Sequence, residues 1–356
     1  MINSIYVKKL GHLPEVEIKL PPLTIITGQN NTNKTLLLKA INFLCDRNIQ
    51  SLSNAYFLPE HLVNILHSDT ISMKLQGEIN RREFFKDYFL QTIEESGKLK
   101  KIIASTPDDS PIYQPATCLI SVARYQSDTG PAIFSDDDLP TYWAFGYEGE
   151  YTLNVLHRCK DIDPIPDVMR HPDHPNATSF ETNLNYWLQT LSPTFYIDLQ
   201  SLKKNDKEQV SLADGTANLG GAGFSQALPV VTALLLLGGA AEAEKVSPVL
   251  LLENPDSRLH PKAQTQLGLL VARAVLAGIQ CVVETYSDHF FDGVRMAVAS
   301  HLLSSDKVLA YFFSQSEESP LTTLTPVEVR ADGGLEAAPD GFFDQSIKNA
   351  FKLAGM

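Results

Sequence analysis

The stretch that most constrains the fold lies near the N-terminus, where an apolar run leads through a polar turn into a helix pattern. Residues 23–27 read LTIIT, residues 28–35 read GQNNTNKT and residues 36–41 read LLLKAI. The first run predicts a buried strand, and the third predicts a helix over about 34–44. A glycine-led loop between a strand and a helix is the setting of the phosphate-binding pattern GxxxxGK[ST]. The stretch therefore favours an α/β fold built around this loop.

Three residues of the loop match the phosphate-binding pattern, namely Gly28, Lys34 and Thr35. In such a loop, backbone N–H groups, here including those of Asn30 and Asn31, surround phosphates at a helix N-terminus. Lys34 would meet the β- and γ-phosphates of a nucleotide, and Thr35 would hold Mg²⁺. The alternative is a polar turn without a ligand, because short motifs carry false positives.

The loop departs from the pattern at its second glycine, which is replaced by Asn33. Glycine is favoured there because the backbone needs a positive φ and a close approach to phosphate. Asparagine tolerates the left-handed conformation better than other side chains, but its amide adds bulk beside the phosphate. We therefore expect binding to survive with a weakened affinity.

Composition excludes several classes of protein. The 356 residues include 42 acidic and 29 basic side chains, and the resulting net charge of −13 argues against an extended nucleic-acid surface. The four cysteines are far apart and form no CxxC pair, so neither a zinc knuckle nor a disulfide framework is expected. The N-terminus lacks the features of a signal peptide, and the apolar stretch VVTALLLLGGAA is too short to span a bilayer. These features predict a cytoplasmic protein without a membrane partner.

Hydrophobic periodicity predicts the remaining elements. Strands are expected at 4–10, 15–20, 116–126, 194–200, 208–214, 248–255, 279–285, 307–313 and 325–331. Helices are expected at 183–191, 218–237, 261–278 and 341–353. The polar stretch 49–110, which contains NRREFFKDYFLQTIEESGKLKK, reads as helical. We therefore predict a core formed by residues 1–48 and 191–356, interrupted by an inserted helical and loop lobe at 49–190.

A second chemical element is the run VLLLENPDSRLHP, in which four apolar residues end in Glu253. A buried strand that ends in an acid delivers a carboxylate to Mg²⁺, directly or through water. The alternative is an acid that caps the next turn. Because a helix and another apolar strand follow, parallel pairing of the two strands is expected.

Five segments together carry a family resemblance. They are LTIITGQNNTNKTLLLKAI, NLGGAGFSQALP, LLLENPDSRLHPKAQ, ETYSDHFFDGVRMAV and DGFFDQ, in this order. The chain resembles bacterial AAA-type ATPases with an ABC-like head, of the OLD, RecF and SMC classes, and more closely a subgroup with a C-terminal domain of unknown function. The resemblance implies an α/β P-loop NTPase of the ABC-ATPase head type, with a mixed sheet flanked by helices and an inserted, mostly helical lobe.

The resemblance also implies a signature element in NLGGAGFSQ. Its candidate residues are Gly221, Gly223 and Ser225, which would touch the γ-phosphate of ATP bound by the other subunit. A glycine turn that opens a helix is a suitable anion site. The alternative is an ordinary helix cap before a core helix.

The hydrolytic residues that the resemblance implies are altered. Glu253 stands where most ABC enzymes have aspartate, and Asn254 stands where they have the catalytic glutamate. Asparagine can orient a water molecule but cannot accept its proton, and Asp256 is the nearest carboxylate that could accept it instead. Tyr286 replaces the histidine of the switch strand, whereas Glu284 of the same motif remains.

Two functions follow from these features. The first is a nucleotide-dependent switch that binds ATP and Mg²⁺, forms a homodimer through the nucleotide interface, and regulates an effector protein in bacterial anti-phage defence. Nucleic acid would be reached only through that partner. The alternative is a pseudo-ATPase scaffold with little or no hydrolysis, because the departures lie where hydrolysis is assisted.

Overall fold

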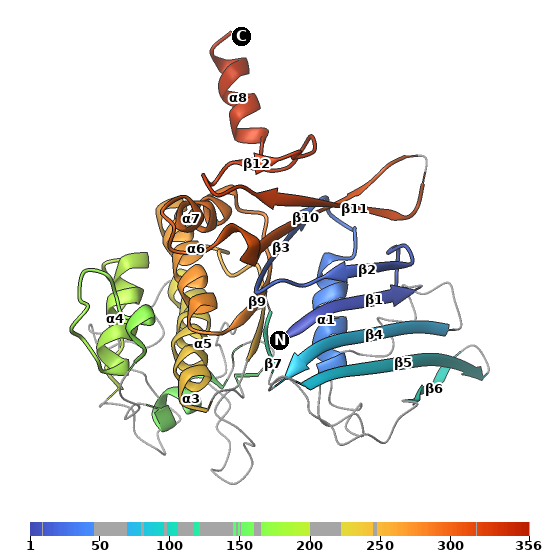
Figure 1. Cartoon of the computed structure of the whole chain (residues 1–356), viewed down its shortest axis with the longest axis horizontal. Coiled ribbons are helices and arrows are strands. Elements are labelled where there is room, and N and C mark those ends of the chain that lie inside the picture. The colour runs from blue at the N-terminus through green and yellow to red at the C-terminus, as the bar shows by residue number, and fades with distance from the viewer. Residues whose placement is uncertain are drawn as a thin grey trace.

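The computed structural model describes thirteen ranges of the chain (Figure 1). They are residues 1–8, 10–45, 70–79, 82–95, 98–105, 117–121, 145–146, 149, 151–159, 165–199, 222–244, 248–317 and 319–355.

A seven-stranded mixed sheet forms the centre of the molecule. Its order is β12 (Leu335–Glu336), β11 (Thr322–Val329), β10 (Val308–Gln315), β3 (Leu23–Gly28), β9 (Gln280–Glu284), β8 (Val249–Glu253) and β7 (Thr117–Ile120). The strands from β10 to β7 are parallel, whereas β11 and β12 pair antiparallel at one edge. Every residue of β8 and β9 is buried, as expected for parallel strands covered on both faces. Because β3, β9 and β8 are parallel, their carboxyl ends meet at one edge of the sheet, where ligands of open α/β sheets bind.

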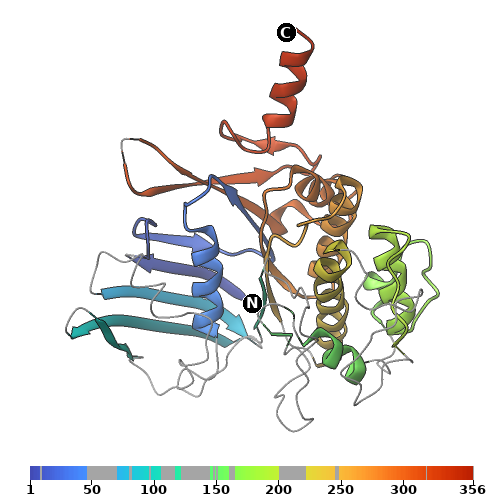
Figure 2. The same ribbon diagram turned by 180° about the vertical axis from the view of Figure 1, so that it is seen from behind.

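Alternate residues of the central strands enter two separate cores. Leu250 and Leu252 of β8 belong to one core, and Val249 and Leu251 belong to the other. This follows from the two-residue repeat of a strand. The described helices are α1 (Lys34–Cys45), α3 (Thr152–Cys159), α4 (Phe180–Leu191), α5 (Ala222–Glu244), α6 (Pro261–Leu276), α7 (Asp288–Ala299) and α8 (Gln345–Leu353). Helices α4 to α7 lie on one side of the sheet, and α1 lies on the other side (Figures 1 and 2).

A second, antiparallel sheet lies beside α1. Its order is β2 (Val16–Lys19), β1 (Ile2–Lys8), β4 (Thr70–Ile79), β5 (Arg82–Glu95) and β6 (Lys98–Ser105). The prediction of helix for the 49–110 stretch is therefore wrong over residues 70–79, 82–95 and 98–105, and the rest of that stretch lies outside the described residues. Charged helix formers dominate this segment, but four aromatic residues within 84–89 favour a strand. Pairing of β4 with β1, in the register Ile5 to Leu75, overrides the weak helical propensity.

One further prediction is wrong in the described residues. Residues 194–198 form no strand, because the backbone of Ile197 is satisfied by a side chain instead of a neighbouring strand. Asn185 of α4 accepts from Ile197 N at 2.8 Å and donates to Ile197 O at 2.8 Å. The strand expected at 208–214 lies outside the described residues. The division of the chain at 48 and 190 stays a prediction, although Leu184 and Trp187 share one core with α5 and α6.

Helix α5 is longer than the sequence suggested. Residues Ala222–Ala241 are apolar enough and long enough to cross a membrane by length and composition, but 78% of the tested 18-residue window is buried inside the protein. The helix packs against α3, α4 and α6. Its apolar character is therefore explained by its place in the core. In contrast, α8 projects from the rest of the molecule, and its described residues are all exposed (Figure 1).

Candidate functional site

The polar loop begins where β3 lies against β10. Gly28 has φ +134°, and a Cβ at this position would lie 2.0 Å from the carbonyl oxygen of Phe313. Only glycine fits such an approach of two backbones. Gln29 N also donates to Phe313 O at 2.8 Å. The start of the loop is thereby held on the neighbouring strand.

Asn33 occupies the position of the missing glycine in the left-handed conformation, with φ 65°. Asn31 is also left-handed, with φ 63°. The side-chain oxygen of Asn33 accepts from His12 N at 2.9 Å, and its amide lies against Gly11, where a Cβ would be 2.7 Å from Nδ2. The bulk that we expected beside a phosphate is therefore directed to the turn between β1 and β2.

Lys34 is 3% exposed and turns back into the loop. Its Nζ donates to the carbonyl oxygen of Gln29 and to Thr32 Oγ1, the latter at 3.3 Å. The same atom lies 4.8 Å from the centre of the Tyr286 ring, a cation–π contact. Burial lowers the pKa of Lys34, and the neighbouring charge of Glu284 opposes this shift. The ammonium group is thus enclosed between the loop backbone and an aromatic ring.

Thr35 contacts the last residue of β9 directly. Its Oγ1 donates to Glu284 Oε2 at 2.8 Å. Glu284 pairs in register with Glu253, so the two acids end adjacent parallel strands. They are 1% and 8% exposed, respectively. Burial raises the pKa of Glu284 to about 7; the Thr35 hydrogen bond opposes this shift, and the charge of Glu253 adds to it.

Sequence reasoning named Glu284 only as a retained residue of a motif and assigned it no role. The signal that could have found it is the same as for Glu253, an acid at the end of a fully apolar strand. Its partner Thr35 lies 249 residues earlier in the chain, which no local pattern reveals.

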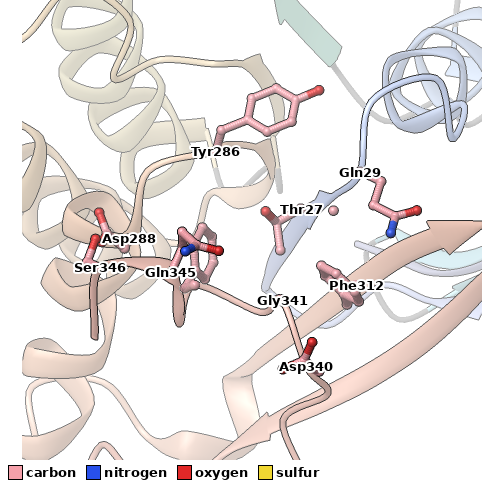
Figure 3. Close-up of a pocket in the computed structure, with 11 residues that line it drawn as sticks. Thr27, Gln29, Tyr286, Asp288, Phe312, Asp340, Gly341, Gln345 and Ser346 are labelled. Carbon is pink, nitrogen blue, oxygen red and sulfur yellow. Dashed lines mark hydrogen bonds between the residues drawn. The ribbon is translucent and has the colours of Figure 1, made fainter. Parts of the chain in front are cut away.

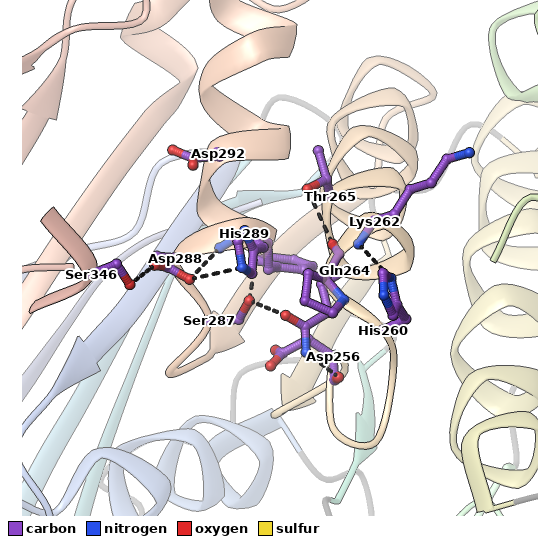
Figure 4. A network of polar contacts seen from close by, with 12 residues as sticks. Asp256, His260, Lys262, Gln264, Thr265, Ser287, Asp288, His289, Asp292 and Ser346 are labelled. Carbon is purple, nitrogen blue, oxygen red and sulfur yellow. Dashed lines mark hydrogen bonds and ion pairs between the residues drawn. The ribbon is translucent and has the colours of Figure 1, made fainter. Parts of the chain in front are cut away.

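Asp256 joins the loops that follow β8 and β9 (Figure 4). Its Oδ1 accepts from Thr285 Oγ1 at 2.6 Å, and Thr285 Oγ1 accepts from Ser287 N at 3.0 Å. Ser287 Oγ donates to Gln264 at 2.7 Å and caps α7 by accepting from Phe290 N. These contacts give Asp256 a structural part in the network, and its part as a base stays a prediction.

Asn254 begins the turn after β8 in the left-handed region, with φ 45°. Its backbone N–H donates to Glu284 O at 2.8 Å, which ties this turn to the end of β9. The candidate water-orienting residue is therefore held next to the two acids.

The signature-like residues lie at the start of α5. Gly223 and Ser225 belong to its first turn, and Gly221 lies outside the described residues. A Cβ at Gly223 would lie 3.1 Å from Arg258 O and 3.4 Å from the Phe195 ring. Within one chain, Gly223 thus packs on the loop before α6, which gives this glycine a structural reason.

A pocket of about 460 Å³ opens beside the polar loop (Figure 3). One wall comes from the end of β3 and from residues 286–288, which follow β9. The other wall comes from β10 and from residues 340–346. Its lining residues are Thr27, Gly28, Gln29, Tyr286, Asp288, Phe312, Asp340, Gly341, Phe343, Gln345 and Ser346. Ser346 Oγ donates to Asp288 Oδ2 at 2.9 Å, which joins the two walls. Sequence reasoning recognised the DGFFDQ segment but did not place it beside the loop.

Tyr286 lines this pocket and is 49% exposed. Burial of the rest of its side chain, together with the charges of Glu284 and Glu253, raises the pKa of Tyr286 to about 12. The phenol therefore stays protonated at neutral pH. It contacts Lys34 through the ring face.

Comparisons with known proteins agree with this arrangement. A family described as a protein of unknown function, DUF3696, matches residues 303–353. No curated protein matches the sequence. Among solved structures, an SMC head bound to the C-terminal winged-helix domain of ScpA matches with a TM-score of 0.52 and 11% identity, over 92% of this chain and 98% of that chain. The chain has the fold of an SMC head domain.

Two other SMC heads match less well. The SMC head domain from Thermotoga maritima has a TM-score of 0.45 and 14% identity, over 92% of this chain and 99% of that chain. An Smc head from Pyrococcus furiosus, bound to the C-terminal domain of ScpA, has a TM-score of 0.48 and 10% identity, over 99% of both chains.

The predicted fold class is confirmed as an α/β fold with a mixed sheet flanked by helices, the fold of an SMC ATPase head. The DUF3696 match agrees with the predicted C-terminal domain of unknown function. The resemblance to the OLD and RecF classes stays a prediction.

Proposed function

We propose that the chain is an ATP-binding, ABC-like ATPase subunit that acts as a nucleotide-dependent switch. The observation that carries the proposal is the position of Lys34, enclosed by a strand-loop-helix turn whose glycine and left-handed residues match a phosphate-binding loop. The ammonium group would exchange its bond to the Gln29 carbonyl for a phosphate oxygen. The loop N–H groups at the start of α1 would supply the remaining donors.

The chemistry of the donor set fits Mg²⁺. The Thr35 hydroxyl and the Glu253 carboxylate are oxygen ligands of the kind that Mg²⁺ prefers. Thr35 donates to Glu284, which lies opposite Glu253 on the adjacent strand. The metal would neutralise phosphate charge when bound. Thr35 would bind it directly, and Glu253 would bind it directly or through water.

The same proposal extends to assembly. Two copies would enclose nucleotide between the loop of one and residues Gly221, Gly223 and Ser225 of the other. The SMC head of the matching structure is bound to ScpA, which supports a protein partner for a head of this fold. We propose an effector as that partner, in bacterial anti-phage defence, with nucleic acid reached only through it.

Hydrolysis is the step for which the chain is poorly equipped. Asn254 cannot accept a proton from water, and Asp256 Oδ1 already accepts from Thr285. Tyr286 is neutral where a histidine is expected. We therefore propose slow turnover, and the specific observations on these residues favour a scaffold without hydrolysis as the second candidate.

The first prediction concerns ATP binding. We expect Mg²⁺-ATP to bind the purified chain, and Lys34→Ala to abolish measurable binding because the only loop ammonium group is lost. Isothermal calorimetry measures this, and phosphate release is followed in the same samples. Lys352→Ala, which removes an exposed lysine at the end of α8, is the matched control. Equal affinity of the Lys34→Ala and Lys352→Ala variants would contradict the proposal.

The scaffold is separated from the slow ATPase by restoring the expected residues. Turnover that is present only in the Asn33→Gly, Tyr286→His double variant supports the scaffold. Slow turnover of the unaltered chain, lost in Lys34→Ala, supports the ATPase.

A further inference from the structure

We infer that Glu284 is a positioning residue that orients the Thr35 hydroxyl toward the metal of the bound nucleotide. This inference rests on the proposed function and assigns a role in that site to an acid that the mechanism above does not use.

The hydrogen of the Thr35 hydroxyl group fixes the direction of its lone pairs. Thr35 Oγ1 carries one hydrogen and two lone pairs, and it donates the hydrogen to Glu284 Oε2 at 2.8 Å. The lone pairs therefore point away from Glu284 and stay available to a cation. In a helix, a threonine can instead donate to a backbone carbonyl three or four residues earlier, which gives it two rotamers. The bond to Glu284 selects one of them.

Glu284 is itself held by rigid backbone on both sides. Asn254 N donates to Glu284 O at 2.8 Å on the side of β8. On the side of β3, Thr285 N donates to Ile26 O at 3.0 Å. The carboxyl group thus starts from a strand in the middle of the sheet and reaches the first turn of α1. A side chain on a strand fixed in this way orients the metal ligand Thr35 more accurately than a side chain on a loop would.

Packing alone does not account for an acid at this position. The preceding residues Cys281, Val282 and Val283 are apolar and fully buried, and an apolar side chain would continue that pattern. Glu284 is 1% exposed, and burial of a carboxyl group without a compensating interaction is unfavourable. The largest compensating interaction that the structure provides is the bond to Thr35, and the charges of Lys34 and Lys39 add to it. Partners of this kind, behind the ligands of a metal, commonly orient those ligands.

The test compares three forms of residue 284. Glu284→Val removes the acceptor and keeps a strand-forming side chain, whereas Glu284→Gln keeps an oxygen that can accept from Thr35. The affinity for ATP is measured by calorimetry with Mg²⁺ and with EDTA, and the ratio of the two affinities is the readout. We expect Glu284→Val to lower this ratio about 10- to 100-fold, the usual effect of losing such a partner, and Glu284→Gln to keep most of it. Affinity in EDTA should be unchanged in both variants.

The outcomes separate the inference from the proposed function. If the unaltered chain binds ATP more tightly with Mg²⁺ and Glu284→Val keeps the same ratio, Glu284 does not position Thr35. A loss of affinity in EDTA as well would assign it a structural role and overturn the inference. If the unaltered chain shows no effect of Mg²⁺ on its affinity, the proposed metal site fails together with the inference. Should Glu284→Val fail to fold, Glu284→Ala removes the same acceptor and leaves the Thr35 ligand in place, and an unchanged ratio in that variant overturns the inference equally.

Discussion

At the scale of single residues, the loop is maintained by backbone conformations that few side chains adopt. Asn33 is left-handed, and its amide is fixed by the backbone of His12 in a turn of the small sheet. The replacement of glycine by asparagine thus adds a tertiary contact while it keeps the conformation. The structure gives this substitution a role in anchoring the loop.

We predict that Asn33→Ala is more destabilising than Asn33→Gly. Alanine at φ 65° is strained by about 1 kcal/mol or more. Both variants lose the hydrogen bond to His12 N, which contributes about 1 kcal/mol. The free energy of unfolding in urea should therefore fall by roughly 2 kcal/mol in Asn33→Ala and about 1 kcal/mol in Asn33→Gly. Equal losses would show that the left-handed conformation is not maintained.

At the scale of elements, the crossing of α6 and α7 determines the position of residues 286–287, which directly precede α7. Gly268 and Gly293 face each other at this crossing, and a Cβ on either would lie within 2.2 Å of a carbonyl oxygen of the other helix. The two backbones are therefore in direct contact. Because α7 begins at Asp288, directly after Tyr286 and Ser287, this contact positions the Tyr286 ring that lies against Lys34.

We predict that Gly268→Ala destabilises the protein by about 3 kcal/mol or more, because the added methyl group meets Phe290 O and the helices must separate. Gly239→Ala in α5 is the matched control, since nothing lies within 4 Å of its Cβ position. This control should be neutral or stabilising by about 0.5–1 kcal/mol, because alanine favours helix over glycine. Urea unfolding measures both, and similar stabilities of the two variants would contradict the close crossing.

At the scale of the whole molecule, a buried acid in the central sheet makes stability depend on pH. Burial raises the pKa of Glu284 to about 7 from its ordinary value of 4.5. Between these values the folded protein keeps a proton that the unfolded chain has released. The contribution of Glu284 is therefore fully present below about pH 4.5 and is lost as the pH rises through 7.

We predict that the free energy of unfolding of the nucleotide-free protein falls between pH 5 and pH 8 by up to about 3 kcal/mol through this group, since one pKa unit corresponds to about 1.4 kcal/mol. Glu284→Gln cannot ionise, so its stability should fall less over the same range. Urea unfolding at the two pH values gives the comparison. An equal fall in both proteins would assign the pH dependence to other groups.

The predictions from sequence were most accurate where one local pattern decides the outcome. The apolar runs of β3, β8 and β9 are long enough to be buried on both faces, and the glycine-led turn after β3 leads directly into α1. These patterns identified the parallel centre of the sheet, the loop and its lysine. The helical prediction for the 49–110 stretch was wrong in its described strands β4 to β6, because local propensity there is weak and the edge of β1 requires a partner.

The sequence by itself determined the strand-loop-helix turn, its residues Gly28, Lys34 and Thr35, and the acid at the end of β8, because each depends on neighbours along the chain. Only the tertiary structure decided which distant groups complete the site. The partner of Thr35 is Glu284, the amide of Asn33 is held by His12, and the second wall of the pocket comes from residues 340–346. Parallel pairing brings together the ends of strands that are far apart in the sequence, so these contacts exist only after the sheet has formed.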